Sequence, residues 1–189
     1  MKNEHCYLVG TMSTAIETSI SPHSHLAGIR FRPAGFAAFY EYDSLHEYTD
    51  RTVEFDNKLA PDLRGTRKGL RNGLKYYLDE FFLRKLPERQ PQLTPVITEI
   101  ESRNGLVDVP VLARNHCVSV RQLQRAFKMH IGLSPKEFLN VIRFRYALRL
   151  IKNNAMPTLL DIALEAGYYD HAHLSNEIRR HAGVAPSLL

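Results

Sequence analysis

Tryptophan is absent from the 189-residue chain, and cysteine occurs only twice, as Cys6 and Cys117. Two cysteines cannot form a disulfide framework or a four-thiolate zinc site, which is typical of a reducing compartment. No apolar run approaches the roughly 18 residues that a membrane-spanning helix needs. The first ten residues, MKNEHCYLVG, lack the apolar core of a signal peptide. The sequence therefore predicts a cytoplasmic protein with no membrane partner.

Catalytic and cofactor motifs are also lacking. Nothing in the chain resembles a nucleophile elbow, a phosphate-binding loop or a pair of catalytic carboxylates. His23 and His25 lie close in the sequence, but no third metal ligand accompanies them. We therefore expect a protein that is not an enzyme, with no cofactor and no metal site.

Acidic residues are scarce in the second half of the chain. Residues 1–92 carry 13 Lys and Arg against 12 Asp and Glu, whereas residues 93–189 carry 12 against 8. Within 109–160, Glu137 is the single acid among nine cations. Positive charges in such excess over negative ones repel one another unless an anionic partner or counterions neutralise them. Nucleic acid is the obvious candidate partner, although an anionic protein surface or plain solvation would also satisfy the charge.

The pattern of residues 1–92 predicts a small mixed α/β region. Alternation in 26–32 and the run 7–10 predict strands, and a helix is expected to start near Gly35. A clearer amphipathic helix ends around Leu86. The proline-containing segment 87–92 is the predicted domain boundary. The aromatic side chains expected in a core rather than in a ligand cage are Phe36, Phe39, Tyr40, Tyr76, Tyr77, Phe81 and Phe82.

The remaining chain, 93–189, is predicted to form helices only. Helices are expected over about 94–103 and 109–116, and Ser119 is a candidate N-cap for the next one. The sequence SPKE at 134–137 is a capping box with proline in the first helical turn. The helix that it starts should run to about Lys152, about 25 Å at 1.5 Å per residue. Because this helix is apolar on two flanks, we expect it to connect two small bodies.

This helical half contains a degenerate internal repeat of about fifty residues. The stretch LQRAFK at 123–128 aligns with LSNEIR at 174–179. Each copy is a helix of about eight residues, a turn and a helix of about twelve, which is helix-turn-helix spacing. The two units are expected at about 109–131 and 158–182. Their turn position is filled by Cys117, expected to be a small buried hydrophobic residue, and by Gly167.

The helical half contains the stretches SVRQLQRAFK, IGLSPKEF, RFRYALRLI, DIALEAGYYDHAHLS and RRHAGVAP. In these stretches the chain resembles the AraC/XylS family of bacterial transcription regulators. The earlier stretches LVGTMS and GIRFRPAG resemble the end of a sensory domain from one branch of that family. The resemblance implies two helix-turn-helix units joined by a long helix, each with a recognition helix in the major groove. Because the connector is shorter than the roughly 34 Å between successive grooves, full engagement is expected to bend the duplex.

Outward positions on the two recognition helices, taken with the resemblance, predict which residues meet DNA. Leu123 and Phe127 are expected to face the core. Arg can bind guanine and Gln can bind adenine bidentately, with roughly 1–3 kcal/mol of discrimination. The candidate base-contacting residues are Arg121, Gln122, Gln124, Arg125, His171, Ala172, Ser175 and Asn176, and the candidate backbone-contacting residues are Ser119, Lys128, Lys136 and Arg179.

The first unit is expected to dominate base readout. Residues 161–189 hold four acids against Arg179 and Arg180, and Asn176 stands where relatives frequently have Arg. The second unit is therefore expected to contact mainly the DNA backbone, and a packing module without base contacts is the alternative. The sequence leaves two roles open for the basic stripe of Arg145, Arg149 and Lys152: contact with DNA phosphates, or a solvated helix face.

Together these features predict a sequence-specific regulator of transcription that binds double-stranded DNA. The alternative is an interaction module whose N-terminal half binds a protein or small effector, with a degenerate DNA domain, so that the chain acts as a regulatory antagonist. RNA polymerase and a small-molecule effector at the N-terminal region are further candidate partners. The operator, the effector, the direction of regulation and the oligomeric state stay open.

Overall fold

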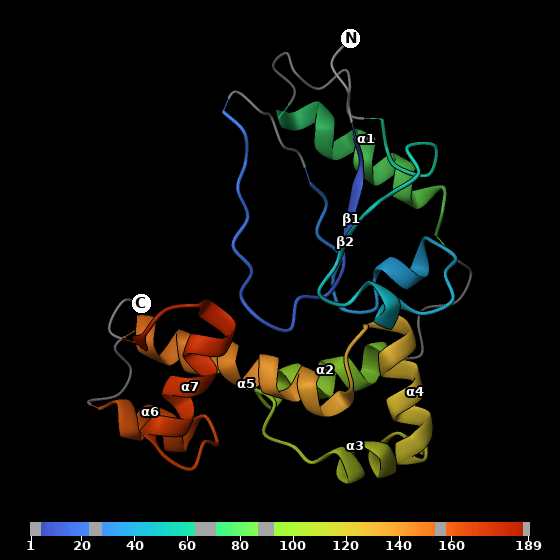
Figure 1. The fold of residues 1–189 in the computed structure, drawn as a ribbon. Helices are drawn as coiled ribbons and strands as arrows, with labels where there is room; N and C mark the ends of the chain where they lie inside the picture. The colour runs from blue at the N-terminus through green and yellow to red at the C-terminus, as the bar shows by residue number, and fades with distance from the viewer. Residues whose placement is uncertain (1–4, 23–27, 63–70, 87–92, 154–157, 187–189) are drawn as a thin grey trace.

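The structure is a computed structural model, and it describes residues 5–22, 28–62, 71–86, 93–153 and 158–186. Figure 1 shows two helical bodies joined by one long helix, with the N-terminal region lying against them. The fold is mainly α, as predicted: the described residues form seven α-helices and one two-stranded sheet. The predicted boundary at 87–92 and the pair His23 and His25 lie outside the described residues.

A small antiparallel sheet organises the start of the N-terminal region. Strand β1 (Tyr7–Val9) pairs with β2 (Thr52–Glu54), so the strand predicted at 7–10 is confirmed. The prediction of a strand over 26–32 was wrong for its described part, 28–32. Instead, the ring of Phe31 packs in an aromatic cluster with Phe36, Phe39, Tyr40 and Phe82.

The helices of this region are shorter than the sequence predicted. The segment after Gly35 forms only one 3-10 turn, η1 (Phe36–Ala38), and a second 3-10 turn, η2 (Leu45–Tyr48), follows it. Helix α1 (Arg71–Leu83) ends before the predicted residue 86. Tyr76 is 73% exposed, and its assignment to the core was wrong because it lies on the outward face of α1, one position from the half-buried Tyr77.

Capping signals define the starts of the helices in the second half. Ser119 and Ser134 are both N-caps, and each forms a capping box with the residue three positions later. Both predicted starts are therefore confirmed. The helices are α2 (Thr94–Ser102), α3 (Val109–Asn115), α4 (Val120–His130), α5 (Pro135–Lys152), α6 (Leu159–Glu165) and α7 (His171–Ala182).

Helix α5 belongs to two hydrophobic cores in succession, which confirms its predicted role as a connector. Its N-terminal half, through Ile142, packs in the core of α2, α3 and α4. From Phe144 onward it packs in the core of α6 and α7. The two cores divide α5 along its length rather than between two flanks, because its apolar residues encircle the helix. Figure 1 shows α5 running from one body into the other.

The turns of the two helix-turn-helix units have the same hydrogen bonds. Val118 N–H donates to Ala113 O at 3.0 Å, and Tyr168 N–H donates to Ala163 O at 2.8 Å. In both turns the preceding residue is left-handed, with φ of 55° at Cys117 and 76° at Gly167. This is the Schellman motif that ends many helices. Cys117 is exposed, so its predicted burial was wrong: the left-handed turn directs its side chain to solvent.

The shared turn geometry predicts a difference between two matched alanine substitutions. Gly167→Ala is expected to lower the free energy of unfolding by about 1–2 kcal/mol, because only glycine adopts this backbone region without a steric cost. Cys117→Ala is the control and should change it by less than about 0.5 kcal/mol, since a side chain already occupies that left-handed position. Urea denaturation of both variants measures the difference, and equal losses would contradict the interpretation.

Candidate nucleic-acid interface

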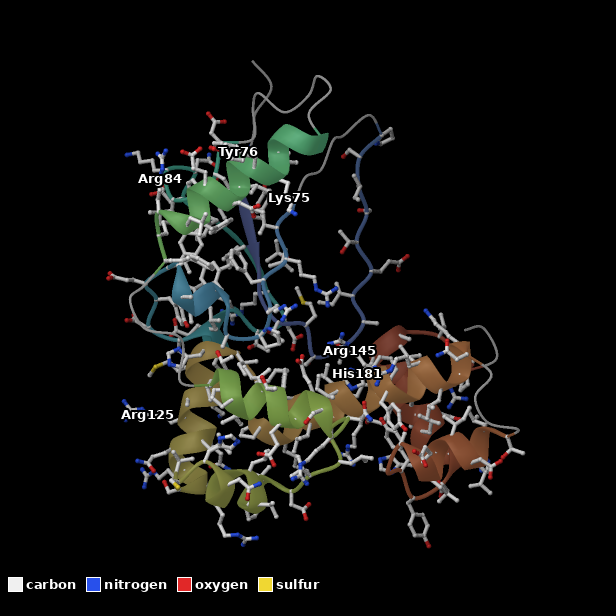
Figure 2. All side chains as sticks on the ribbon, turned by 180° about the vertical axis from the view of Figure 1, so that it is seen from behind. Lys75, Tyr76, Arg84, Arg125, Arg145 and His181 are labelled. Atoms are coloured by element: carbon white, nitrogen blue, oxygen red, sulfur yellow. The ribbon has the colours of Figure 1, made fainter. Side chains whose placement is uncertain are left out.

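Helix α4 separates an apolar face from a cationic and amide face. Leu123 and Phe127 are buried, and the ring of Phe127 lies edge-on to Phe138 at 5.7 Å. Both were predicted to face the core, and the structure confirms it. The outward residues are all exposed, and Figure 2 shows Arg125 projecting from α4 away from the other helical body. These exposed residues are Arg121, Gln122, Gln124, Arg125 and Lys128.

The capping box restricts two of the predicted DNA-contacting residues. Gln122 Oε1 accepts from Ser119 N–H at 2.8 Å and from Ser119 Oγ at 2.9 Å, while Ser119 Oγ accepts from Gln122 N–H. The acceptor of the Gln122 amide is thus already engaged. Bidentate adenine recognition needs both a donor and an acceptor, so Gln124 is better suited to it than Gln122.

Helix α7 presents a weaker set of polar groups. Its N-cap Asp170 accepts from His173 N–H, and Leu174 and Ile178 are fully buried. The predicted contact residues His171, Ala172, Asn176 and Arg179 are exposed, and Ser175 is half-buried. Three of these side chains bond within the helix: Ser175 Oγ donates to His171 O at 2.7 Å, and Arg179 donates to Asn176 Oδ1 at 3.3 Å.

The second turn contains one residue more than the first. Ser119 follows Val118 directly as the N-cap of α4, whereas Tyr169 is inserted between Tyr168 and the N-cap Asp170. Tyr169 is 87% exposed, beside the first turn of α7. Sequence reasoning missed this residue, although the repeat contained the signal: its offset changes from 50 residues before the turn to 51 after it.

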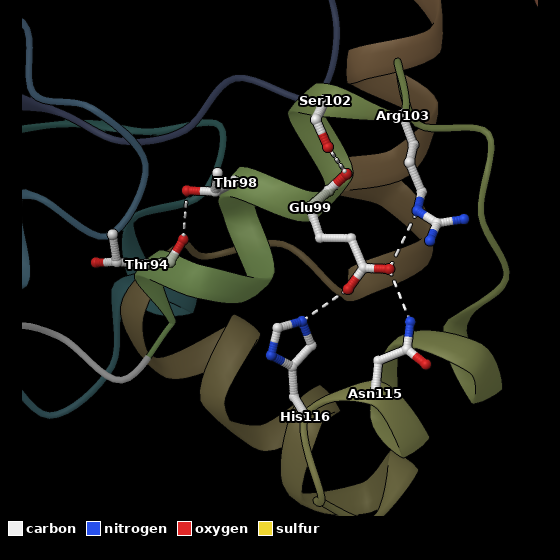
Figure 3. Close-up of polar contacts among 7 residues, drawn as sticks. All are labelled: Thr94, Thr98, Glu99, Ser102, Arg103, Asn115 and His116. Carbon is white, nitrogen blue, oxygen red and sulfur yellow. Dashed lines mark hydrogen bonds and ion pairs between the residues drawn. The ribbon is translucent and has the colours of Figure 1, made fainter.

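A polar network joins α2 to the end of α3, the helix that supports α4. Glu99 accepts from Asn115 Nδ2 at 2.8 Å and lies 2.9 Å from His116 Nε2, and Arg103 approaches the same carboxylate at 3.1 Å (Figure 3). These partners hold the pKa of Glu99 below its ordinary value, and the Asn115 amide contributes most. The network therefore fixes the residues directly before the first turn.

The remaining predicted cations differ in their surroundings. Lys136 is exposed in the first turn of α5, and Arg145 and Lys152 are exposed further along that helix. Arg149 donates to Asn104 Oδ1 at 2.7 Å and lies over the ring of Tyr146. Arg149 thus has a structural contact, whereas Lys136, Arg145 and Lys152 form no ion pair within the described part of the chain.

The described residues were also compared with the requirements of a metal site and of a membrane-spanning helix. Within the residues that the structure describes, no group of three or more His, Cys, Asp or Glu side chains could hold a metal ion. None of the described helices is long and apolar enough to cross a membrane.

Two repeated units of helix, Schellman turn and polar-faced helix define the helix-turn-helix class of DNA-binding protein. Comparison with known proteins agrees: residues 112–189 match the family described as "Helix-turn-helix domain", and residues 1–54 match a domain of unknown function, DUF6597. Through its helical half the chain is similar to transcription regulators of the AraC/XylS type.

Several individual relatives share this half. The transcriptional regulator MtrA of Neisseria gonorrhoeae is 35% identical over 80 residues, which are 42% of this chain and 26% of that protein. The transcriptional activator RhaS of Escherichia fergusonii is 33% identical over 75 residues, or 40% of this chain and 27% of that protein. A crystal structure of an AraC-type transcriptional regulator from Chromobacterium violaceum is 27% identical, with a TM-score of 0.49, over 52% of this chain and 88% of that chain. The chain thus matches about a quarter of the length of the two regulators.

Proposed function

We propose that the chain is a sequence-specific regulator of transcription that binds double-stranded DNA through both helix-turn-helix units. The observation that carries the proposal is the outward face of α4, where Arg121, Gln124, Arg125 and Lys128 are exposed without an acid among them. Such a face combines charges for phosphates with donors and acceptors for base edges.

The proposal assigns unequal roles to the two units. Arg121, Gln124 and Arg125 read bases from α4, and Lys128 and Lys136 contact the DNA backbone. In α7, the side chains of Ser175 and Asn176 already bond within the helix, which supports a smaller share of base readout. Residues 93–189 form the DNA-binding domain in this proposal, and residues 1–92 form a separate N-terminal region that is a candidate site for an effector.

An interaction module with a degenerate DNA domain remains the second candidate. The aromatic cluster around Phe31 and the match of residues 1–54 to a domain of unknown function favour a separate role for the N-terminal region. In that case the chain would act through protein contacts alone, and loss of the α4 side chains would leave its regulatory effect intact.

Salt titration of DNA binding separates these candidates. Each phosphate contact releases counterions from the DNA. A plot of log binding constant against log salt concentration therefore falls with a slope of about −0.9 per contact. Lys128→Ala is expected to weaken binding to all duplexes alike and to reduce this slope by about 1. Glu101→Ala, an exposed change on α2, is a control that should not reduce the slope. Fluorescence anisotropy with a labelled duplex measures both, and a chain that shows no salt-dependent binding would support the interaction module.

A further inference from the structure

The segment Thr11–Ala15, which follows β1, contacts both helix-turn-helix units. Figure 1 shows the chain after β1 running down to the helical half and turning back. Thr11 bonds beside the C-terminal end of α4, and Ala15 bonds to the C-terminal end of α7. We call residues 11–15 the strap. Through these two bonds, the C-terminal ends of both recognition helices contact the same short segment.

The first attachment satisfies carbonyl groups at the end of α4. Thr11 Oγ1 donates to Ile131 O at 2.6 Å. Thr49 Oγ1 donates to Gly132 O at 2.8 Å, and His46 Nδ1 lies 2.9 Å from the same oxygen. Ile131 and Gly132 directly follow the last residue of α4, and these side chains supply hydrogen-bond partners for their carbonyls.

Close backbone approach makes this attachment specific. Gly132 has φ of 91°, and a Cβ at that position would lie 3.0 Å from Leu45 O and 2.8 Å from Thr49 Oγ1. The η2 turn therefore packs directly on the backbone that follows α4. A residue larger than glycine would push the N-terminal region away from the recognition helix.

Asp50 fastens the middle of the strap. Its carboxylate accepts from Ser13 N–H at 2.6 Å and from Ser13 Oγ at 2.7 Å, and its own N–H donates to Thr11 O at 3.1 Å. Asp50 is left-handed, with φ of 57°, a conformation that Asp and Asn tolerate better than most residues. The strap is thus held to the N-terminal region between its two attachments.

The second attachment lies on α7. Ala15 N–H donates to Arg180 O at 3.1 Å, and Arg180 stands in the last turn of that helix, whose carbonyls lack partners within the helix. A Cβ at Gly183 would lie 3.3 Å from Ala15 Cβ, so the strap packs closely on the residue that ends α7.

These contacts restrain a motion that α5 alone would allow. The two units are otherwise connected by α5, which can bend as long helices do, by Leu106, whose side chain lies beside Gly167, and by the bond from Arg149 in the second half of α5 to Asn104. The strap adds a connection at the C-terminal ends of α4 and α7. Their N-terminal turns, the part of a recognition helix that contacts base edges, are left free.

We propose that Thr11, Asp50 and Ala15 position the two recognition helices, so that the strap sets the spacing between the DNA half-sites that the chain accepts. This inference rests on the proposed function. With the strap in place, the chain binds half-sites at one separation. With the strap released, the two units adjust to other separations.

Half-site spacing is the property to measure, because simple destabilisation would weaken binding to every duplex equally. The duplex is the sequence that the full wild-type chain selects from a random pool, together with versions carrying one base pair more or fewer between the half-sites. Wild type is expected to lose about tenfold or more in affinity on respacing, since misplaced contacts or added DNA deformation cost at least about 1.4 kcal/mol. The double variant Thr11→Val with Asp50→Gly is expected to lose less than about threefold, because glycine keeps the left-handed turn but removes the carboxylate.

Three further variants complete the comparison. Asp50→Asn retains a side-chain acceptor and should discriminate between spacings as wild type does, as should Thr14→Ala, which removes a hydroxyl from an exposed strap residue. Thr11→Val alone, which deletes the hydroxyl bonded to Ile131 O, should lose less affinity on respacing than wild type, and this comparison holds even if the double variant fails to fold. Equal spacing discrimination by wild type and the released variants overturns this inference alone. A wild-type chain that binds no duplex overturns the proposed function as well.

Discussion

Replacing Arg125 by alanine is expected to lower the affinity of the chain for its selected duplex by roughly 5- to 150-fold, the equivalent of one bidentate base contact. The guanidinium is exposed on α4 and projects away from the other helical body (Figure 2), so the substitution removes a DNA contact without leaving a cavity. Gln124→Ala is expected to act similarly, and to relax the base preference at its own position. Affinities for the selected duplex and for single-base variants of it measure both effects.

The matched control lies at the equivalent position of the second unit. Asn176 aligns with Arg125 in the repeat, and its Oδ1 already accepts from Arg179. Asn176→Ala is therefore expected to cost less than about 1 kcal/mol, or about fivefold in affinity. Losses of the same size at Arg125 and Asn176 would contradict the dominance of the first unit. Unchanged regulation after both Gln124→Ala and Arg125→Ala would favour the interaction module.

Replacing Phe127 by alanine is expected to lower the free energy of unfolding by about 3–5 kcal/mol, the range for large aromatic side chains in a core. Phe127 is fully buried and packs on Phe138 in the centre of the first body. That loss is a large share of the roughly 5–15 kcal/mol that stabilises a typical domain. Val120→Ala, at a partly exposed position on the same helix, should change the stability by less than about 0.5 kcal/mol. Urea denaturation measures both, and similar losses would mean that α4 is packed differently.

Local signals made the helical half predictable from the sequence. Ser119 and Ser134 begin helices because their side chains bond to the backbone three residues later, and this depends on neighbouring residues alone. The repeat likewise fixed the order of the two units, and the apolar spacing of Leu123 and Phe127 identified the buried face of α4. Those features need no knowledge of distant parts of the chain.

Predictions failed where a distant contact or a special backbone conformation decides the structure. The alternation at 28–32 is typical of a strand, but Phe31 packs on Phe82, which lies far along the chain. Cys117 was expected to be buried from its apolar neighbours, yet its left-handed backbone exposes it. The bonds of Thr11 to Ile131 and of Ala15 to Arg180 span more than 100 residues. No periodic pattern encodes such pairings.

Selection of bound duplexes from a random pool, followed by base-resolved footprinting of the selected sequence, tests the central claim most directly. The account predicts two half-sites about one helical turn apart, with strong base preference and sharp mutational sensitivity at the half-site of α4 and broader preference at that of α7. Enrichment of no sequence, or equal protection and equal mutational sensitivity at the two half-sites, would contradict it.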